Sequence, residues 1–491
     1  MIWLFISTGV FLGWSLGANH AVNVFGTAVV SRMIKFRVAA TVAGIFVTLG
    51  AVFSGAGASR TLNELGAVNE LAGCFTVALA VALAVTWMTG LKLPVSTSQA
   101  VVGGIVGWNL FTGSPTDMAS LSKIISTWVV CPLLSAAFAY VLYQAITMVV
   151  RRSRMHILHM DAYTRIGLLV AGAFASYTLG ANNIGNVMGM FVAASPFENI
   201  DVFHLFSFSG TQQLFLIGGI AITIGIFTYS YKVMVTVSDQ LFKITPLAGL
   251  IVVVAESLVL FLFASEGLEA WLIGHGLPAI PLVPLSSTQV VIGAVIGVGF
   301  AKRGRGINYH VLGRIAVGWI TAPVAACSIS FVALFIVQNV FEQKVVHLVP
   351  YSVTRDVVQA LENEGIPAQP LVKLSGRKFS GSADFRQALR GQYRWTEKQL
   401  YQIFSYSELD SIRVDSSQVT KAFAPAPLSA GQTEAVKKLH GRLFVHHWQV
   451  IQALVDSCQE WRPRSGRGTE LFNKELKQRR EILFTSFKNQ R

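Results

Sequence analysis

Ten apolar runs, separated by short polar loops, account for most of the first 340 residues. Each run is long enough to approach or exceed the roughly 30 Å of hydrocarbon that a membrane helix must cross. The runs form two groups of five. The first group covers 2–31, 38–58, 71–91, 94–111 and 123–150, and the second covers 163–194, 211–231, 246–265, 284–300 and 311–339. The pattern predicts an all-α polytopic membrane protein.

Two polar motifs interrupt these apolar runs, and each motif occurs once in each half of the chain. The segment Leu16–Gly26 is repeated, with changes, at Leu179–Gly189, and Pro94–Gln99 is repeated at Pro284–Gln289. An unpaired amide in hydrocarbon costs several kcal/mol, so these segments must be buried in protein or line a cavity. The duplication predicts two repeats that contain broken or half helices, as in secondary transporters.

The basic loop residues predict the orientation of the helices, because positive charge marks the cytoplasmic side. All the basic clusters fall inside if the N-terminus lies outside and every run crosses the membrane once. Five crossings per half then make the second repeat inverted relative to the first. The clusters are Arg32/Lys35/Arg37, Lys92, Arg151/Arg152/Arg154, Lys232/Lys243 and Lys302/Arg303/Arg305.

The last 150 residues have a different character, because they hold 23 of the 39 Lys and Arg residues and 15 of the 25 Asp and Glu residues. They predict a small, soluble, basic and mainly helical domain, with amphipathic stretches at 352–364, 433–461 and 468–487. The crossing count places this domain outside. The predicted organisation is repeat 1 at 1–155, repeat 2 at 156–340 and the C-terminal domain at 341–491.

Composition narrows the class of protein further. The chain is 53% hydrophobic and 13% charged, against roughly 25% charged residues in soluble domains. Its net charge of +14 resides in loops and in the C-terminal domain, so we expect no nucleic-acid partner. The four cysteines are too scattered for a metal site, and no nucleophile and base lie at usable spacing. We expect a multi-pass protein of a bacterial inner membrane that is not an enzyme.

The Pro94 and Pro284 motifs each predict a helix that starts inside the membrane. Proline suits the first helical turn, and Ser or Thr hydroxyls cap free N–H groups. A helix N-terminus attracts anions through these groups and the macrodipole. Two facing starts would surround a tetrahedral oxyanion; the alternative is ordinary capping of buried helices. The predicted substrate donors are Ser96, Thr97, Ser98, Gln99, Ser286, Ser287, Thr288 and Gln289.

Burying a bare oxyanion is prohibitively costly, and no Lys or Arg stands clearly in the middle of a run. We therefore expect a cation or proton to enter with the anion. The pairs Asn19/Asn23 and Asn182/Asn186 offer amide and freed backbone oxygens suited to Na⁺, although hydrogen bonding between helices is the alternative. Glu256 is an acid in the middle of a run, either a proton or cation partner or a structural residue.

Over residues 1–340 the sequence resembles the inorganic phosphate transporter (PiT) family, whose members are secondary carriers driven by Na⁺ or H⁺. The resemblance rests on both Gly-Ala-Asn repeats, both Pro-x-Ser-[Thr/Ser] motifs and Gly293–Gly299. It implies phosphate at the helix starts and coupling cations at the Gly-Ala-Asn segments. The family usually has Asp after Gly-Ala-Asn, whereas this chain has His20 and Asn183. His20 could carry a proton or be an uncharged structural imidazole.

These observations predict a symporter that moves inorganic phosphate with H⁺ or Na⁺ by alternating access. Sulfate or another tetrahedral oxyanion is an alternative substrate, and a sensor or scaffold with a degenerate transporter core is an alternative function. The expected partners are phosphate and the lipid bilayer, with the chain as a homodimer. We expect no cofactor, and no metal ion apart from coupling Na⁺.

Overall fold

The computed structural model describes residues 2–90, 95–153, 156–202, 206–241, 245–303, 309–419, 423, 426–466 and 469–487. The chain folds as two compact units. The first, the core, consists of Met1–Phe111, Thr116–Glu266 and Ile280–His347. The second, the tail unit, consists of Leu348–Arg491 together with two short internal segments, Thr112–Pro115 and Gly267–Ala279. The predicted boundary at 340/341 does not include these internal segments.

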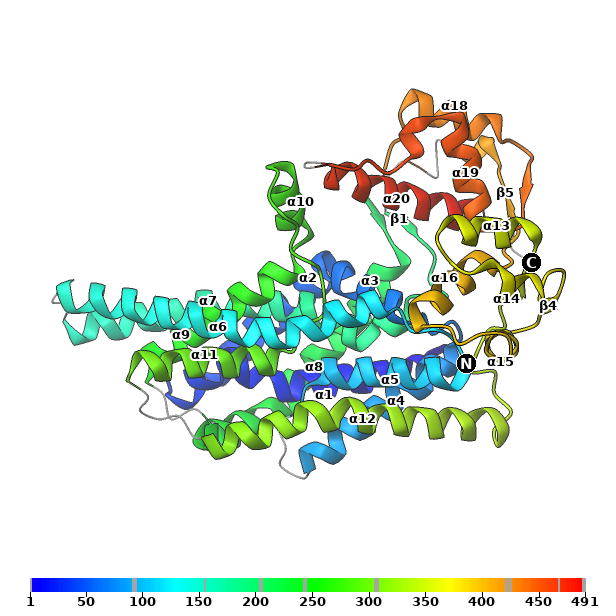
Figure 1. The fold of residues 1–491 in the computed structure, drawn as a ribbon. Helices are drawn as coiled ribbons and strands as arrows, with labels where there is room; N and C mark the ends of the chain where they lie inside the picture. Colours follow the sequence, from blue (N-terminus) through cyan, green and yellow to red (C-terminus); the bar gives the residue numbers. More distant parts are fainter. Residues whose placement is uncertain are drawn as a thin grey trace. The chain divides into compact units, whose positions relative to one another are not determined.

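Long helices that lie side by side form the core (Figure 1). In chain order, the elements up to residue 339 are α1 (Ile2–Val30), α2 (Phe36–Ser54), α3 (Ala56–Leu65), α4 (Leu71–Gly90), α5 (Thr97–Thr112), α6 (Met118–Ser153), α7 (Ile157–Met188), the 3₁₀ turn η1 (Gly189–Phe191), β1 (Ile200–Val202), β2 (Phe206–Phe208), α8 (Gly210–Leu241), α9 (Pro246–Ala264), α10 (Glu266–Gly274), α11 (Ser287–Ala301) and α12 (Tyr309–Asn339).

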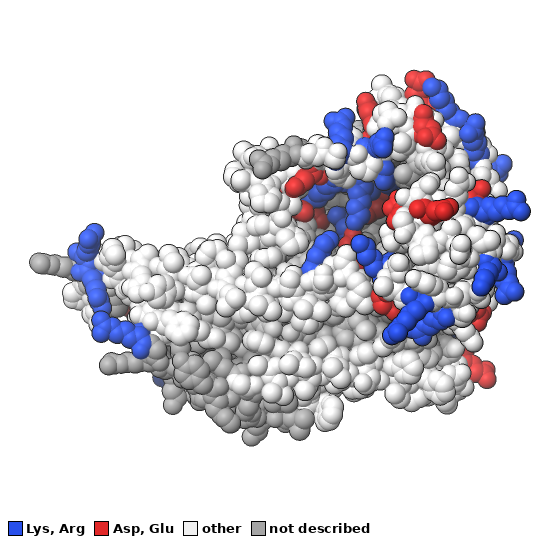
Figure 2. Space-filling model, in the orientation of Figure 1, with Lys and Arg blue, Asp and Glu red and all other residues white. Residues whose placement is uncertain are grey.

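Each of the ten predicted apolar runs coincides with one of these helices. The short helices α3 and α10 and the antiparallel β1–β2 hairpin were not predicted, because each is too short to give a clear periodic signal. Within the described residues, seven helices are long and apolar enough to cross a membrane: α1, α2, α4, α6, α8, α9 and α12. On the face of the core drawn in Figure 2, almost no charged residues lie between its two ends. The chain is a mainly helical, multi-pass membrane protein.

The helices that begin with the Ser/Thr motifs are shorter than a full crossing. Helix α5 has 16 residues and α11 has 15. At a rise of 1.5 Å per residue they span only about 22–24 Å, against a hydrocarbon thickness of roughly 30 Å. Their N-termini can therefore lie within the membrane, as the half-helix prediction requires.

Glycines at equivalent positions bring the two halves of the core into backbone contact. A Cβ atom at Gly17 would overlap the carbonyl oxygen of Ile222, and a Cβ atom at Gly180 would overlap that of Val47. Gly17 and Gly180 occupy the same place in the repeated motif, so each half contacts the other through the equivalent glycine. Helix α1 thus packs on α8 of the second half, and α7 packs on α2 of the first half.

The half helices α5 and α11 also contact helices of the opposite half through glycines at equivalent positions. A Cβ atom at Gly103 of α5 would overlap the carbonyl oxygen of Pro323 in α12, and a Cβ atom at Gly293 of α11 would overlap that of Pro132 in α6. Each half helix therefore lies against the last long helix of the opposite half. Only glycine permits so close a backbone approach.

Helices α1 and α7, which carry the repeated Gly-Ala-Asn motif, run in opposite directions. Gly9, early in α1, lies against Met188 at the end of α7, while Phe25, late in α1, lies against Gly172 in the first half of α7. This antiparallel packing of corresponding helices is the arrangement that an inverted repeat requires.

The tail unit consists mainly of helices, together with two-residue strands and three-residue 3₁₀ turns. Its elements after residue 348 are β3 (Tyr351–Ser352), α13 (Arg355–Asn363), α14 (Ala368–Val372), β4 (Lys378–Phe379), α15 (Ser382–Arg390), α16 (Glu397–Ser407), β5 (Ile412–Arg413), η2 (Ser416–Gln418), α18 (Ala430–Lys438), β6 (Leu443–Phe444), α19 (His447–Ser457), η3 (Gln459–Trp461) and α20 (Glu470–Phe487).

Two of the three predicted amphipathic stretches match single helices, α13 and α20. The stretch 433–461 does not, because strand β6 divides it into α18 and α19. The break follows Gly441, whose φ of 76° lies in the left-handed region and ends the preceding helical turn.

The tail unit contains an internal duplication that the sequence analysis missed. Lys373–Phe379 and Lys438–Phe444 share the pattern Lys-Leu-x-Gly-Arg-x-Phe and lie 65 residues apart. In both copies the glycine has a positive φ, and its N–H donates to a carbonyl oxygen just after the first strand, Gly376 to Val353 at 2.8 Å and Gly441 to Val414 at 2.9 Å. One hydrophobic core surrounds each copy, so the tail unit consists of two related lobes.

Candidate functional site

Helices α5 and α11 begin with the same local structure. The Ser96 hydroxyl accepts a hydrogen bond from the backbone N–H of Gln99 at 3.3 Å, and the Ser286 hydroxyl accepts one from the N–H of Gln289 at 3.3 Å. Each serine therefore caps its helix and leaves other first-turn N–H groups available. Pro94 lies outside the described residues.

The two helix starts meet in the interior of the core. The Ser98 hydroxyl, in the first turn of α5, donates to the backbone carbonyl of Leu285 at 2.8 Å, two residues before α11 begins. Seven of the eight predicted substrate donors are buried, and Thr288 is half-buried. The structure thus brings together two helix N-termini that lie 190 residues apart in the chain.

His20 connects the two helix starts from the side of α1. Its Nδ1 lies 2.9 Å from the hydroxyl of Ser287 at the start of α11, and its Nε2 lies 3.4 Å from the hydroxyl of Thr97 at the start of α5. Which ring nitrogen donates depends on the tautomer, since a neutral imidazole has one donor and one acceptor. The imidazole is only 6% exposed, so it is an integral part of this polar cluster.

Helix α7 contributes asparagines from the other half. The Asn182 side chain donates to the carbonyl of Leu285 at 2.9 Å and accepts from the N–H of the same residue at 2.7 Å. Asn186 donates to the Ser98 hydroxyl at 2.7 Å. These asparagines therefore hold both helix starts in place, which is the role in hydrogen bonding between helices that the sequence offered as the alternative to cation binding.

The other predicted coupling residues of α1 and α7 form no hydrogen bond with the described residues of the helix starts. Asn183 donates to the carbonyl of Leu179 in its own helix and accepts from Asn186. Asn19 donates to the carbonyl of Ser15, also in its own helix, and is half-buried. Asn23, also half-buried, makes no hydrogen bond with the described residues. Among the Gly-Ala-Asn residues, His20, Asn182 and Asn186 therefore contact the helix starts directly.

Several buried oxygens have no hydrogen-bond partner among the described residues. They include Oε1 of Gln99 in the first turn of α5, Oδ1 of Asn186 on α7 and, on α9, both carboxyl oxygens of the fully buried Glu256. Unpaired buried acceptors are costly, so a bound cation, a proton or a hydrogen-bond donor on a ligand would stabilise them.

The site contains no formal positive charge from a basic side chain. Within the described part of the chain the only buried Lys or Arg is Arg386, which belongs to the tail unit. The same residues include no group of three or more His, Cys, Asp or Glu that could hold a metal ion. An anion here would therefore be bound by hydroxyls, amides and helix N-termini.

One contributor to the site was not predicted. The backbone of Leu285 accepts from both Ser98 and Asn182, and its apolar side chain gave no sequence signal for this role.

Comparisons with known proteins identify the family. The model of the "Phosphate transporter family" matches residues 16–330 and 279–454. The chain is similar to a putative phosphate permease of Methanocaldococcus jannaschii, with 25% identity over 66% of this chain and 93% of the relative. It is also similar to a probable low-affinity inorganic phosphate transporter of Bacillus subtilis, with 26% identity over 66% and 93%.

A solved structure described as "The sodium-dependent phosphate transporter" has a similar fold. It has a TM-score of 0.54 and 22% identity, and the match covers 69% of this chain and 99% of that one. The resemblance deduced from the repeated motifs is confirmed by the family match, which covers well over half of the chain. The chain belongs to the phosphate transporter family.

Proposed function

We propose that the chain is a symporter that carries inorganic phosphate together with protons. The observation that carries this proposal is the position of His20, which lies between the two helix starts and within hydrogen-bond distance of Ser287 and Thr97. In the family the resemblance places an aspartate at this position. Replacing a carboxylate with an imidazole removes a ligand for Na⁺ and introduces a group that can bind a proton.

The electrostatics of the site support coupling of the two ligands. Each helix N-terminus carries the positive end of a macrodipole, so an imidazolium at His20 would be repelled by both starts when the site is empty. A phosphate anion between the starts would reverse this repulsion. Because coupling between binding sites is reciprocal, a proton on His20 would also increase the affinity for phosphate.

The unpaired acceptors support phosphate over sulfate. Protonated phosphate can donate a hydrogen bond, whereas sulfate at neutral pH can only accept them. Oε1 of Gln99 and Oδ1 of Asn186 are buried and have no described partner. A site that offers such acceptors favours the ligand that can satisfy them, since an unsatisfied buried acceptor costs about 1–3 kcal/mol.

Glu256 is our second candidate for coupling. Helix α9 contacts α1 where Gly249 meets Thr27. Glu256 stands seven residues after Gly249, and His20 stands seven residues before Thr27. The two helices have opposite predicted directions and the same rise per residue, which supports a similar depth for both side chains. Such a buried acid can bind a proton or cation during transport.

We infer that transport proceeds by alternating access, with the two halves moving against each other around the shared helix starts. The exchanged packing of α1 on α8 and of α7 on α2 supports this proposal, because each half can present the same contacts toward either side of the membrane.

The test is uptake of radiolabelled phosphate by proteoliposomes under separate pH and Na⁺ gradients. We expect uptake by the wild-type protein to increase when the outside is acidic and to ignore Na⁺. The variant His20→Gln should lose this pH response but retain counterflow of phosphate. The double variant His20→Asp/Asn183→Asp should gain Na⁺ dependence. His275→Gln, a change at an exposed histidine, is the matched control.

Two outcomes would contradict the proposal at different points. Uptake by the wild-type protein that requires Na⁺ and ignores pH would rule out proton coupling while leaving phosphate transport intact. Absence of phosphate counterflow in the wild-type protein would rule out transport itself and would favour the sensor or scaffold alternative.

A further inference from the structure

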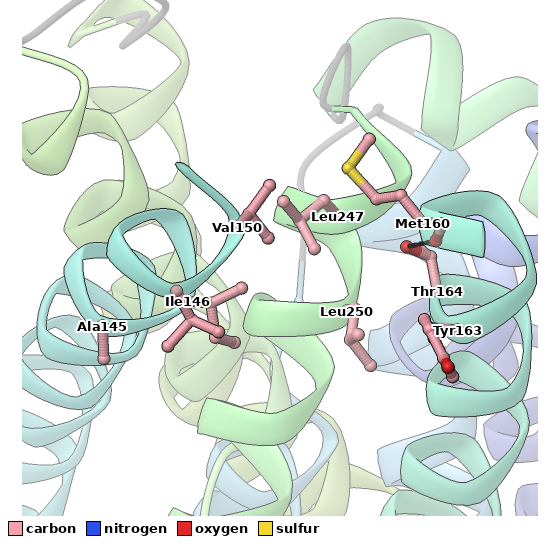
Figure 3. Close-up of a pocket in the computed structure, with 9 residues that line it drawn as sticks. Ala145, Ile146, Val150, Met160, Tyr163, Thr164, Leu247 and Leu250 are labelled. Carbon is pink, nitrogen blue, oxygen red and sulfur yellow. Dashed lines mark hydrogen bonds between the residues drawn. The ribbon is translucent and has the colours of Figure 1, made fainter. Parts of the chain in front are cut away.

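An apolar groove lies at the end of the core where α6 finishes and α7 and α9 begin (Figure 3). Its volume is about 320 Å³. Ile146 and Val150 of α6 form one wall, Leu247 and Leu250 of α9 form the floor, and Met160 of α7 forms the opposite wall. Helix α6 belongs to the first half of the core, and α7 and α9 belong to the second.

The residues that line the groove are almost all apolar. The Thr164 hydroxyl, on its α7 wall, already donates to the backbone carbonyl of Met160 at 2.7 Å. Val149 at its edge is 62% exposed, and the neighbouring Ile166 and Val170 of α7 are 59% and 65% exposed. In a protein that spans a membrane, such apolar surfaces face lipid, so the groove opens toward the bilayer.

Two basic residues follow the groove-lining residues at the end of α6. Arg151 and Arg152 directly follow the lining residues Val149 and Val150 in α6, and both are exposed. Neither forms an ion pair with the described residues, whereas Arg165 on α7 is paired with Asp161 at 3.3 Å. Lys and Arg side chains are visible at this end of the core, at the left of Figure 2. The end of α6 that lines the apolar groove therefore also carries two exposed arginines without an ion-pair partner among the described residues.

We propose that this groove binds one anionic phospholipid, with an acyl chain along Ile146 and Leu250 and the headgroup phosphate at Arg151 and Arg152. An apolar chain and a negative headgroup are the two features that the groove and the two arginines together would recognise. Basic pockets between membrane helices bind anionic headgroups in this way. Because the walls come from both halves of the core, a single lipid would contact both.

Native mass spectrometry of the purified full-length protein tests this assignment. The protein is incubated with phosphatidylglycerol, an anionic lipid, or with phosphatidylcholine, a lipid without net charge. We expect the wild-type protein to retain phosphatidylglycerol preferentially. The double variant Arg151→Gln/Arg152→Gln should lower its affinity about 30-fold, since each basic residue near a headgroup contributes about 1 kcal/mol. Arg37→Gln, an exposed arginine at the start of α2, is the matched control and should have no effect.

A second variant tests the groove separately from its charges. Ala145 is exposed on α6 and lines the groove, so Ala145→Trp should obstruct it without altering the buried core. We expect this variant to lose bound phosphatidylglycerol. Equal retention of the two lipids by the wild-type protein would overturn the proposal, and so would unchanged binding in both the arginine and tryptophan variants. Disulfide crosslinking of Val149→Cys between two copies in native membranes would show that a second chain occupies this face instead.

Discussion

At the scale of single residues, hydrogen bonds to Leu285, Ser98, Thr97 and Ser287 bring the polar motifs of the two halves to one place. Apart from the imidazole of His20, the side chains that meet there carry no ionisable group. An anion would be accommodated in such a site by oriented dipoles and N–H groups rather than by a fixed counter-charge. Loss of any one donor should therefore weaken binding without abolishing it.

Thr97→Ala and Ser287→Ala test this expectation. A hydrogen bond to a charged group contributes about 1.5–3 kcal/mol, so each change should raise the apparent KM for phosphate about tenfold to a hundredfold. Uptake kinetics in proteoliposomes provide the measurement. Thr321→Ala is the control, because the Thr321 hydroxyl bonds only to carbonyl oxygens in its own helix. Unchanged values for both Thr97→Ala and Ser287→Ala would argue strongly against the proposed site.

At the scale of elements, the chain uses glycine for two different purposes. In the core it lets helices approach until backbone touches backbone, as at Gly103 and Gly293. In the tail unit it ends a helical turn with a positive φ, 83° at Gly376 and 76° at Gly441. The first role depends on the absence of a side chain, and the second depends on backbone conformation.

The second role predicts equal effects in the two lobes of the tail unit. Gly376→Ala and Gly441→Ala have open space for a methyl group, so each should destabilise its lobe by about 1 kcal/mol through the backbone alone. Hydrogen exchange of the full-length protein, followed at the β3–β4 and β5–β6 strand pairs, measures each lobe separately.

Gly391→Ala is the matched control, since Gly391 has a φ of −68° and only ordinary contacts around a Cβ atom. It should leave exchange unchanged or slow it slightly. If Gly391→Ala accelerated hydrogen exchange as much as Gly441→Ala does, the positive φ could not be the cause of the destabilisation.

At the scale of the whole molecule, the tail unit includes two segments that connect membrane helices. Within this unit, Arg386 donates to the carbonyl oxygens of Gly113 and Ser114 at 3.4 and 3.3 Å and is paired with Glu397. Lys474 of α20 is paired with Glu269. The loop charges predict that Gly267–Ala279 lies outside, and the crossing count predicts the same side for Thr112–Pro115, so the tail unit should lie outside as well.

Thiol labelling of intact cells tests this topology. In a background without native cysteines, Ser380→Cys, on the exposed surface of the tail unit, should react with an impermeant maleimide. Ser153→Cys at the end of α6 should react only after the membrane is permeabilised. The reverse pattern would invert the predicted orientation of the entire chain.

The sequence was sufficient to predict ten of the core helices and most of the polar residues that cluster at the helix starts. Apolar length reports membrane crossing directly, and a repeated Ser/Thr or Asn in such a run has few acceptable environments. The partners of these residues were not predictable. That His20 reaches both helix starts, or that Leu285 contributes its backbone, depends on which helices pack together, and hydropathy does not encode helix partners.

The tail unit shows a different limit. Its duplication is visible in Lys373–Phe379 and Lys438–Phe444, but the surrounding residues have diverged so far that helical periodicity alone merged α18 and α19 into one stretch. The strands that separate them are two residues long, too short to produce an alternating pattern.

The exchanged glycine contacts have a consequence for biosynthesis. When the ribosome has completed only the first half, Gly103 of α5 has no Pro323 to meet, and Pro132 of α6 still awaits Gly293. The helices of the first half therefore enter the membrane before the partners of Gly103 and Pro132 exist. Assembly can be completed only after α12 has been inserted. A truncated chain that ends between the halves should consequently be a substrate for membrane quality-control proteases, and supplying the second half as a separate polypeptide should protect it.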